Sequence, residues 1–224
     1  MRSVKDPLLR QAIAIALAVG AFGIAFGVVC ADADLSLAKA LALSGLVFGG
    51  SAQLAAVGVA AEGGTAAAAV LAGLLLSARN VAFGVALAPI LTGSLGRRLL
   101  ASHVLIDQSA GVALAQPEPE RARRAFWLTG VAVLVLWLAG TASGWALTGP
   151  IDVEAVGLDA AIPAVFVALL VPRLDRPSHR ASAIAGAAIA LALTPLVAPG
   201  LPILAAALGA GAGLLVRARR AEPA

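Results

Sequence analysis

Two ionisable side chains, Arg79 and Asp107, lie in the interior of long apolar stretches of the sequence. An ionisable group at the centre of a bilayer costs about 2.5–3.5 kcal/mol on insertion scales, so each needs a partner or a water-filled cavity. Arginine can bind a carboxylate through two parallel hydrogen bonds, and aspartate can accept hydrogen bonds from an ammonium group. With apolar walls around them, the two could bind an amino-acid zwitterion. The alternative is an ion pair that only holds two helices together.

Further polar side chains surround these positions in the sequence. Gly49 and Gly50 lie beside a serine and a glutamine in an otherwise apolar run. Glycines there permit a broken helix whose freed backbone groups bind substrate, a device common in transporters. We expect the helix to be broken or closely packed between Gly49 and Gln53, with Gln53 facing a cavity. The predicted substrate-binding residues are Ser51, Gln53, Ser77, Arg79, Asn80, Asp107 and Gln108.

The composition indicates an integral membrane protein. Hydrophobic residues make up 61% of the 224 residues and charged residues 12%, against about 25% charged residues in a typical soluble domain. A lipid bilayer tolerates the large apolar surface that so few charges must leave. The single cysteine, Cys30, excludes an internal disulfide and a cysteine-based metal site. No metalloprotease, Walker or nucleophile-elbow motif is present, so we predict neither an enzyme nor a bound cofactor.

Apolar stretches of spanning length recur along the chain and predict an all-α bundle of transmembrane helices. About 20 apolar residues cross a bilayer as a helix. We therefore expect about eight spanning segments in one transport domain over residues 1–224, with some segments broken. Seven or six crossings remain open, because 36–61, 65–92 or 99–115 could be re-entrant. The expected segments are 11–30, 36–61, 65–92, 99–115, 126–147, 160–171, 181–197 and 201–216.

Lys and Arg residues predict the orientation of these segments. Twelve of the 16 group near the two termini and in the loops at 116–125 and 172–180, and cytoplasmic loops are the basic ones. Both termini and both loops are therefore expected in the cytoplasm. The basic clusters only flank helices, so no nucleic-acid partner is predicted. Arg97 and Arg98 do not fit, because eight crossings would place them outside. Either the outer loop carries them, or a neighbouring segment is re-entrant.

Three short stretches resemble motifs of the AzlC-type branched-chain amino-acid permease family. They are Phe48-Gly49-Gly50-Ser51-Ala52-Gln53, the run from Ser77 to Gly84, and Leu105-Ile106-Asp107-Gln108. Residues 157–166 and 202–213 are similar as well, so the likeness extends in order over about residues 15–215.

The resemblance implies the large subunit of a two-component exporter in the bacterial cytoplasmic membrane. It implies a small AzlD-type membrane partner and proton-driven efflux of valine, leucine, isoleucine and sometimes methionine. Two positions depart from the family pattern, since Asn80 and Gln108 stand where the family commonly has His and Glu. Neither side chain can take up a proton at physiological pH. A transporter of another small metabolite, a passive channel and a membrane scaffold are the alternative functions.

Overall fold

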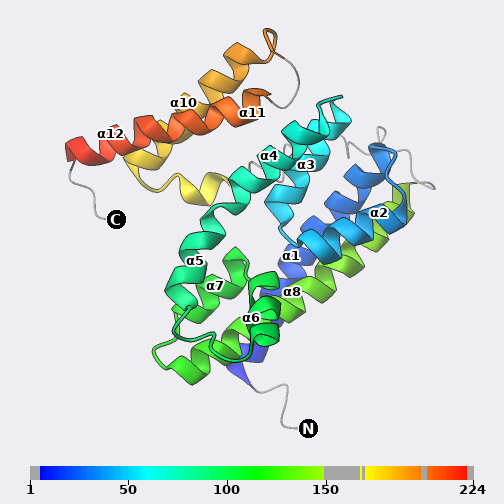
Figure 1. Cartoon of the computed structure of the whole chain (residues 1–224), viewed down its shortest axis with the longest axis vertical. Coiled ribbons are helices and arrows are strands. Elements are labelled where there is room, and N and C mark those ends of the chain that lie inside the picture. The colour runs from blue at the N-terminus through cyan, green and yellow to red at the C-terminus, as the bar shows by residue number, and fades with distance from the viewer. Residues whose placement is uncertain (1–5, 149–166, 168–169, 198–200, 221–224) are drawn as a thin grey trace. The chain divides into compact units, whose positions relative to one another are not determined.

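The computed structural model describes residues 6–148, 167, 170–197 and 201–220. Every regular element in these residues is a helix, which confirms the predicted all-α class (Figure 1). The chain divides into two compact units. Unit 1 comprises Met1–Leu54 and Leu76–Asp159, and unit 2 comprises Ala55–Leu75 and Ala160–Ala224. The single transport domain expected from the sequence stays a prediction.

Two long helices, α1 (Pro7–Asp32, 26 residues) and α8 (Pro119–Thr148, 30 residues), form the centre of unit 1. They lie side by side in Figure 1 and run parallel, because Gly20 faces Leu136 and Gly27 faces Thr141. The Asp6 carboxylate accepts a hydrogen bond from Leu8 N at 3.1 Å and so caps the start of α1. Both helices exceed the length that a bilayer requires.

Glycine lets the backbones of α1 and α8 touch along this seam. A Cβ atom added to Gly23 would lie 2.8 Å from the carbonyl oxygen of Trp137, and one added to Gly144 would collide with the carbonyl oxygen of Ile24. Small residues permit such close approach of helices in membranes. The seam therefore fixes the register of the two helices.

The segment after α1 turns back on itself instead of continuing as one helix. α2 (Leu37–Ala42) passes into one turn of π-helix, η2 (Leu43–Val47), and α3 (Gly50–Ala61) starts after a break. Gln53 donates a hydrogen bond from Nε2 to the carbonyl oxygen of Leu43, so the first turn of α3 lies against η2. We name residues 37–54 the first hairpin.

The first hairpin descends along α8 from its C-terminal end. Trp145 Nε1 donates to the carbonyl oxygen of Leu35 at 2.7 Å, and the Ser44 hydroxyl lies 2.9 Å from that of Thr141. A Cβ atom added to Gly50 would lie 3.0 Å from the Trp137 ring. The tip of the first hairpin therefore lies near the middle of α8.

A second hairpin, residues 95–114, enters from the opposite end of α8. It comprises α6 (Leu95–His103) and α7 (Asp107–Leu114). Before it, the carbonyl oxygen of Ile90 accepts a 2.9 Å hydrogen bond from Arg123, in the first turns of α8. At the end of α6, Val104 packs on Gly130 of α8. In α7, Val112 packs with Leu8 and Ala125, near the starts of α1 and α8. The second hairpin thus begins and ends at the N-terminal end of α8.

The segment expected over 36–61 is broken, and the segment expected over 99–115 is a helical hairpin, so both are interrupted rather than continuous helices. In the described residues, four helices are long and apolar enough to cross a membrane: Pro7–Asp32, Ala66–Leu87, Pro119–Thr148 and Leu201–Arg219. The number of crossings stays a prediction. Most of the expected segment at 160–171 lies outside the described residues.

Unit 2 contains the C-terminal helices. α10 (Pro177–Leu193) packs antiparallel to α11 (Leu201–Ala206), the short η5 (Ala207–Gly209) and α12 (Ala210–Arg220). A Cβ atom on Gly209 would lie 2.6 Å from Gly186 Cα, and one on Gly213 would lie 2.6 Å from Ser178 O. Small residues again allow the backbones to meet.

Candidate functional site

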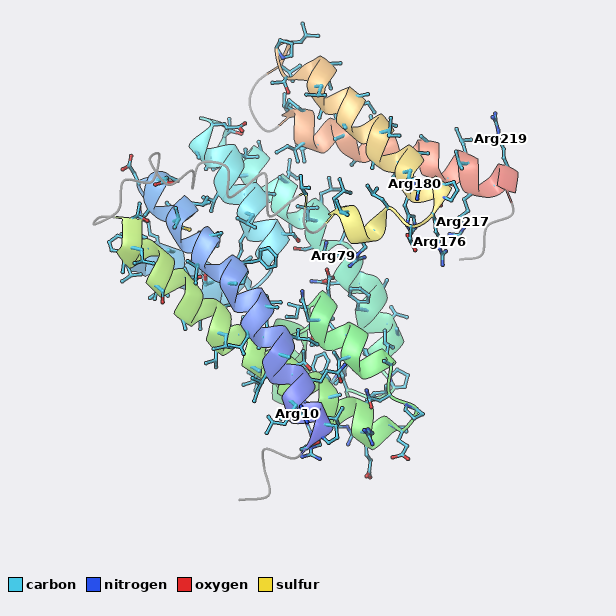
Figure 2. All side chains as sticks on the ribbon, turned by 180° about the vertical axis from the view of Figure 1, so that it is seen from behind. Arg10, Arg79, Arg176, Arg180, Arg217 and Arg219 are labelled. Atoms are coloured by element: carbon cyan, nitrogen blue, oxygen red, sulfur yellow. The ribbon has the colours of Figure 1, made fainter. Side chains whose placement is uncertain are left out.

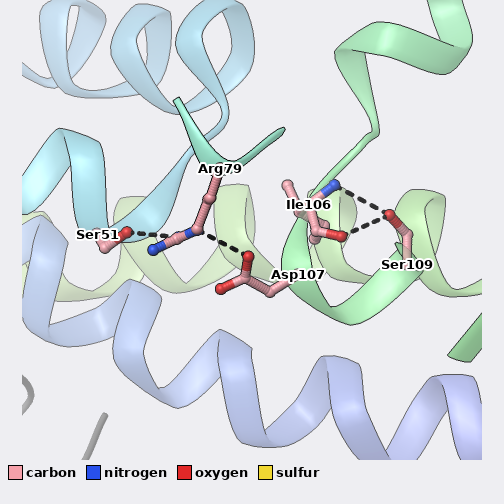
Figure 3. A network of polar contacts seen from close by, with 5 residues as sticks. All are labelled: Ser51, Arg79, Ile106, Asp107 and Ser109. Atoms are coloured by element: carbon pink, nitrogen blue, oxygen red, sulfur yellow. Dashed lines mark hydrogen bonds and ion pairs between the residues drawn. The ribbon is translucent and has the colours of Figure 1, made fainter. Parts of the chain in front are cut away.

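Arg79 lies at a break in a long helix and reaches both hairpins of unit 1. α4 (Ala66–Ser77) ends two residues before it, and α5 (Arg79–Leu87) begins with it. Its Nη2 donates to Ser51 Oγ at 2.8 Å, and its Nε lies 2.8 Å from Asp107 Oδ1 (Figure 3). Figure 2 shows Arg79 far from Arg10, which marks the start of α1. The structure thus brings together three of the predicted binding residues.

Each of these three residues lies at the start of a helix. Ser51 is the second residue of α3, Arg79 the first of α5 and Asp107 the first of α7. A helix start carries roughly half a positive charge and up to four N–H groups without a helical acceptor. Ala78 keeps a helical conformation, so α4 passes almost directly into α5 and only the starts of α3 and α7 carry such groups. Together with the Arg79 guanidinium, these two starts favour an anionic group, and Asp107 balances part of this charge. Broken helices in transporters bind anionic substrate groups in the same way.

The ion pair is open to small molecules rather than sealed in the protein. The side chain of Arg79 is 44% exposed and that of Asp107 is 22% exposed. A ligand can therefore reach either group without first unfolding the surrounding helices. In such a partly exposed pair the ionic attraction alone contributes little to stability.

Ser109 fixes the tip of the second hairpin and was missed by the sequence reasoning. Its buried hydroxyl accepts a 3.0 Å hydrogen bond from Ile106 N and lies 3.1 Å from the carbonyl oxygen of Ile106 (Figure 3). It also donates to the carbonyl oxygen of Val104 at 2.7 Å. A side chain at the third helical position that accepts from the N-cap backbone is half of a capping box. The serine two residues after Asp107 was the available signal. It holds the turn that presents Asp107 to Arg79.

Gln53 supports the tip of the first hairpin. Its side chain is 1% exposed, and its Nε2 satisfies the carbonyl oxygen of Leu43. The expected break lies slightly earlier than predicted, at Phe48 and Gly49, because Phe48 adopts a left-handed conformation (φ 38°). Gln53 is buried within the hairpin, and the expectation that it faces a cavity stays a prediction. A direct contact of Gln53 with substrate stays a prediction.

The remaining predicted ligands flank the ion pair in the sequence. Ser77, Asn80 and Gln108 are each half-buried, next to Arg79 or Asp107 along the chain. Their binding roles stay predictions. The structure adds a contact that the sequence did not indicate, since the rings of Phe48 and His103 lie 5.9 Å apart. This contact joins the two hairpin tips directly.

The sequence profile of the AzlC protein family matches residues 14–151 of the chain, which is more than half of its length. The chain belongs to the AzlC family. The matched part of this AzlC chain contains both hairpins and all the predicted binding residues. The similar stretches at 157–166 and 202–213 lie outside the match. Neither a curated protein nor a solved structure matches the chain.

Within this AzlC chain, the described residues contain no group of three or more His, Cys, Asp or Glu side chains that could hold a metal ion. The polar chemistry of unit 1 is instead concentrated where the two hairpin tips meet Arg79. That place offers a guanidinium within hydrogen-bonding distance of both a carboxylate and a hydroxyl. Such a set is suited to reversible binding of a small charged molecule.

Proposed function

We propose that this chain is a secondary transporter that exports branched-chain or similar small apolar amino acids. The AzlC family is associated with branched-chain amino-acid transport, and the chain is a multi-pass membrane protein by its long apolar helices. The observation that carries the proposal is the Arg79–Asp107 pair beside the starts of α3 and α7. It offers opposite charges to the two ends of a zwitterion in an otherwise apolar setting.

Binding replaces one ion pair with two. The substrate carboxylate takes the place of Asp107 beside Arg79, where guanidinium and helix starts both favour an anion. The substrate ammonium then meets the Asp107 carboxylate. Because the protein charges stay paired in both states, neither is left alone at membrane depth, where an unpaired charge is costly.

The proposal includes a small AzlD-type membrane subunit and coupling to the proton gradient. Large apolar side chains on α5 and α6, such as Val81, Val85 and Leu99, are exposed in the isolated chain and require lipid or protein cover. Asn80 and Gln108 cannot carry a proton, so the proposed coupling does not pass through these two side chains. A pH gradient across the membrane should then accelerate net leucine efflux and leave exchange of leucine for leucine unchanged.

The deciding experiment is counterflow of labelled amino acids in proteoliposomes, with and without the partner subunit. We expect labelled leucine, isoleucine and valine to accumulate against unlabelled leucine inside, and lysine and glutamate not to accumulate. The Arg79→Leu variant, at equal abundance, is the matched inactive control. Counterflow of a different small metabolite, without leucine, would support the alternative that the chain transports another substrate. Rapid equilibration of all small solutes would indicate a channel.

A further inference from the structure

A cavity of about 450 Å³ opens between α5 and α6 in unit 1. Sites for small molecules usually have volumes of roughly 300–1,000 Å³, so a single amino acid fits comfortably. Its walls are mainly small and apolar, with a few polar groups. The residues that line it include Gly84, Ala88, Thr92, Arg98, Ser102 and Leu105.

The cavity is lined by residues from Gly84 to Leu105, the stretch of the chain that joins Arg79 to Asp107. At one end it is lined by Thr92 and Arg98, close in sequence to Ile90, whose carbonyl oxygen contacts Arg123 in the first turns of α8. At the other end it is lined by Leu105, two residues before Asp107 in the second hairpin. The side chain of Leu105 is buried, so it is packed into the second hairpin at this wall of the cavity.

The polar groups of the cavity suit an amino acid with an apolar side chain. Arg98 can bind a carboxylate with two hydrogen bonds. Ser102 donates its hydroxyl proton to the carbonyl oxygen of Leu99 at 2.8 Å, so its oxygen is left to accept from an ammonium group. Gly84 and Leu105 supply the apolar wall, with 3.7 Å between a Cβ added to Gly84 and Leu105 Cδ2.

The end of unit 1 that holds the cavity is also its most basic end. Arg97 and Arg98 lie on α6, and the first two turns of α8 carry three more arginines. Arg123 binds Ile90, and Arg124 pairs with Asp6 at the start of α1, so these groups share one end of the unit. Basic residues concentrate on the cytoplasmic side of membrane proteins. The cavity therefore faces the compartment from which an exporter takes its substrate.

We infer that this cavity is a cytoplasmic access site, in which Arg98 binds the carboxylate of an apolar amino acid before it passes Leu105 to Arg79. The inference rests on the proposed export of such amino acids. It assigns a binding role to Arg98 and a size limit to Gly84. An added Cβ at Gly84 meets only ordinary van der Waals contact, so alanine is accommodated there, whereas a leucine side chain fills the passage.

The first test is leucine counterflow by the full-length chain, with its partner subunit, in proteoliposomes. Gly84→Leu should lower the initial rate at least about tenfold, whereas Gly84→Ala and the matched control Ala86→Leu should stay within about twofold of wild type. Ala86 is exposed on α5 and does not line the cavity. Ala88→Phe provides a second blocking variant if Gly84→Leu does not reach the membrane. Wild-type rates in the blocking variants, at equal abundance, would overturn the inference.

The second test measures occupancy of the cavity without transport. Thr92→Cys, which lines the cavity and leaves Ser102 in place, is alkylated in a Cys30→Ala background with a membrane-impermeant thiol reagent, and Arg79→Leu is added to disable the inner site. Leucine should slow the alkylation in this variant, and Arg98→Gln should abolish the protection, whereas its neighbour change Arg97→Gln should not. Protection that is absent, or that persists with Arg98→Gln, would contradict the inference. Failure of wild-type leucine counterflow would instead overturn the proposed function.

Discussion

Arg79 Nε lies 2.8 Å from Asp107 Oδ1, and each residue is the first of its helix. The contact joins the start of α5 to the tip of the second hairpin. Two roles are compatible with it: it holds the helices together, or it is the resting state of a site whose groups separate to bind a zwitterion. The two roles predict different behaviour of a double variant.

We expect Arg79→Leu with Asp107→Leu to reach the membrane at normal abundance and to remain inactive. Replacing both members of an ion pair by apolar residues is often nearly neutral for stability, whereas removing one member leaves a charge without its partner. Each single variant should therefore be less abundant than the double variant. Western blotting of membranes and leucine counterflow measure the two quantities. Recovery of substantial export in the double variant would show that the pair only braces the helices.

The loop before α6 should lie on the same side of the membrane as the loop before α8. Single cysteines at Ser94 and Glu118 in a Cys30→Ala background should react with an impermeant thiol reagent only from the cytoplasmic side. A cysteine at Ser36, near the opposite end of α8, should react only from outside and serves as the control. The physical reason is that the second hairpin begins and ends at the N-terminal end of α8, so the loops before α6 and before α8 lie at the same end of unit 1. Labelling of the Ser94 cysteine from the outside would contradict this prediction and support the topology with eight full crossings.

Gln53→Leu should abolish transport and lower stability moderately. The change removes the side-chain donor to the carbonyl oxygen of Leu43, which keeps a longer hydrogen bond of 3.4 Å from Phe48 N, so the loss is that of one hydrogen bond, about 0.5–1.5 kcal/mol. The tip that presents Ser51 to Arg79 then loses its support. Ser44→Ala removes a buried hydrogen bond from the same hairpin, away from the site, and should lower the melting temperature while retaining most transport. Wild-type transport by Gln53→Leu would contradict this role.

Gly144→Leu should prevent stable folding of unit 1. Its side chain would have to occupy the position of the Ile24 backbone, and overpacking of this kind costs about 1–3 kcal/mol or more. The matched control is Gly111→Ala in α7, where an added Cβ meets no atom within 4 Å. That change should be neutral or stabilising by up to about 1 kcal/mol, because alanine favours a helix over glycine. Membrane abundance and thermal unfolding in detergent distinguish the two, and equal stability would contradict the tight seam.

The helices α1 and α8 could be predicted from the sequence because a long apolar run has few alternatives to a spanning helix. The hairpins could not be placed in the same way. An apolar stretch such as 99–115 has the same composition whether it crosses the membrane or folds back halfway. Only Arg97 and Arg98, which an even number of crossings placed on the wrong side, indicated the difference. Their position agrees with the positive-inside rule once the second hairpin returns to its starting end.

The two tips show why the break positions were harder to predict. The first break occurs at Phe48, an apolar residue whose left-handed conformation costs about 1–3 kcal/mol and is held by tertiary packing. Packing against His103, far along the chain, cannot be read from neighbouring residues. The second break has no glycine or proline and depends on the hydroxyl of Ser109. The residue types at the site were therefore predictable, but the turns that bring them together were not.

The glycine seam of α1 and α8 limits which parts of unit 1 can move during a transport cycle. Sliding one helix along the other by a single residue would drive a side chain into backbone atoms, so we expect the two helices to behave as one rigid body. The first hairpin, by contrast, is attached to α8 mainly through side chains and single hydrogen bonds. In the proposed export cycle we therefore expect its tip to tilt away from Arg79 while α1 and α8 keep their register.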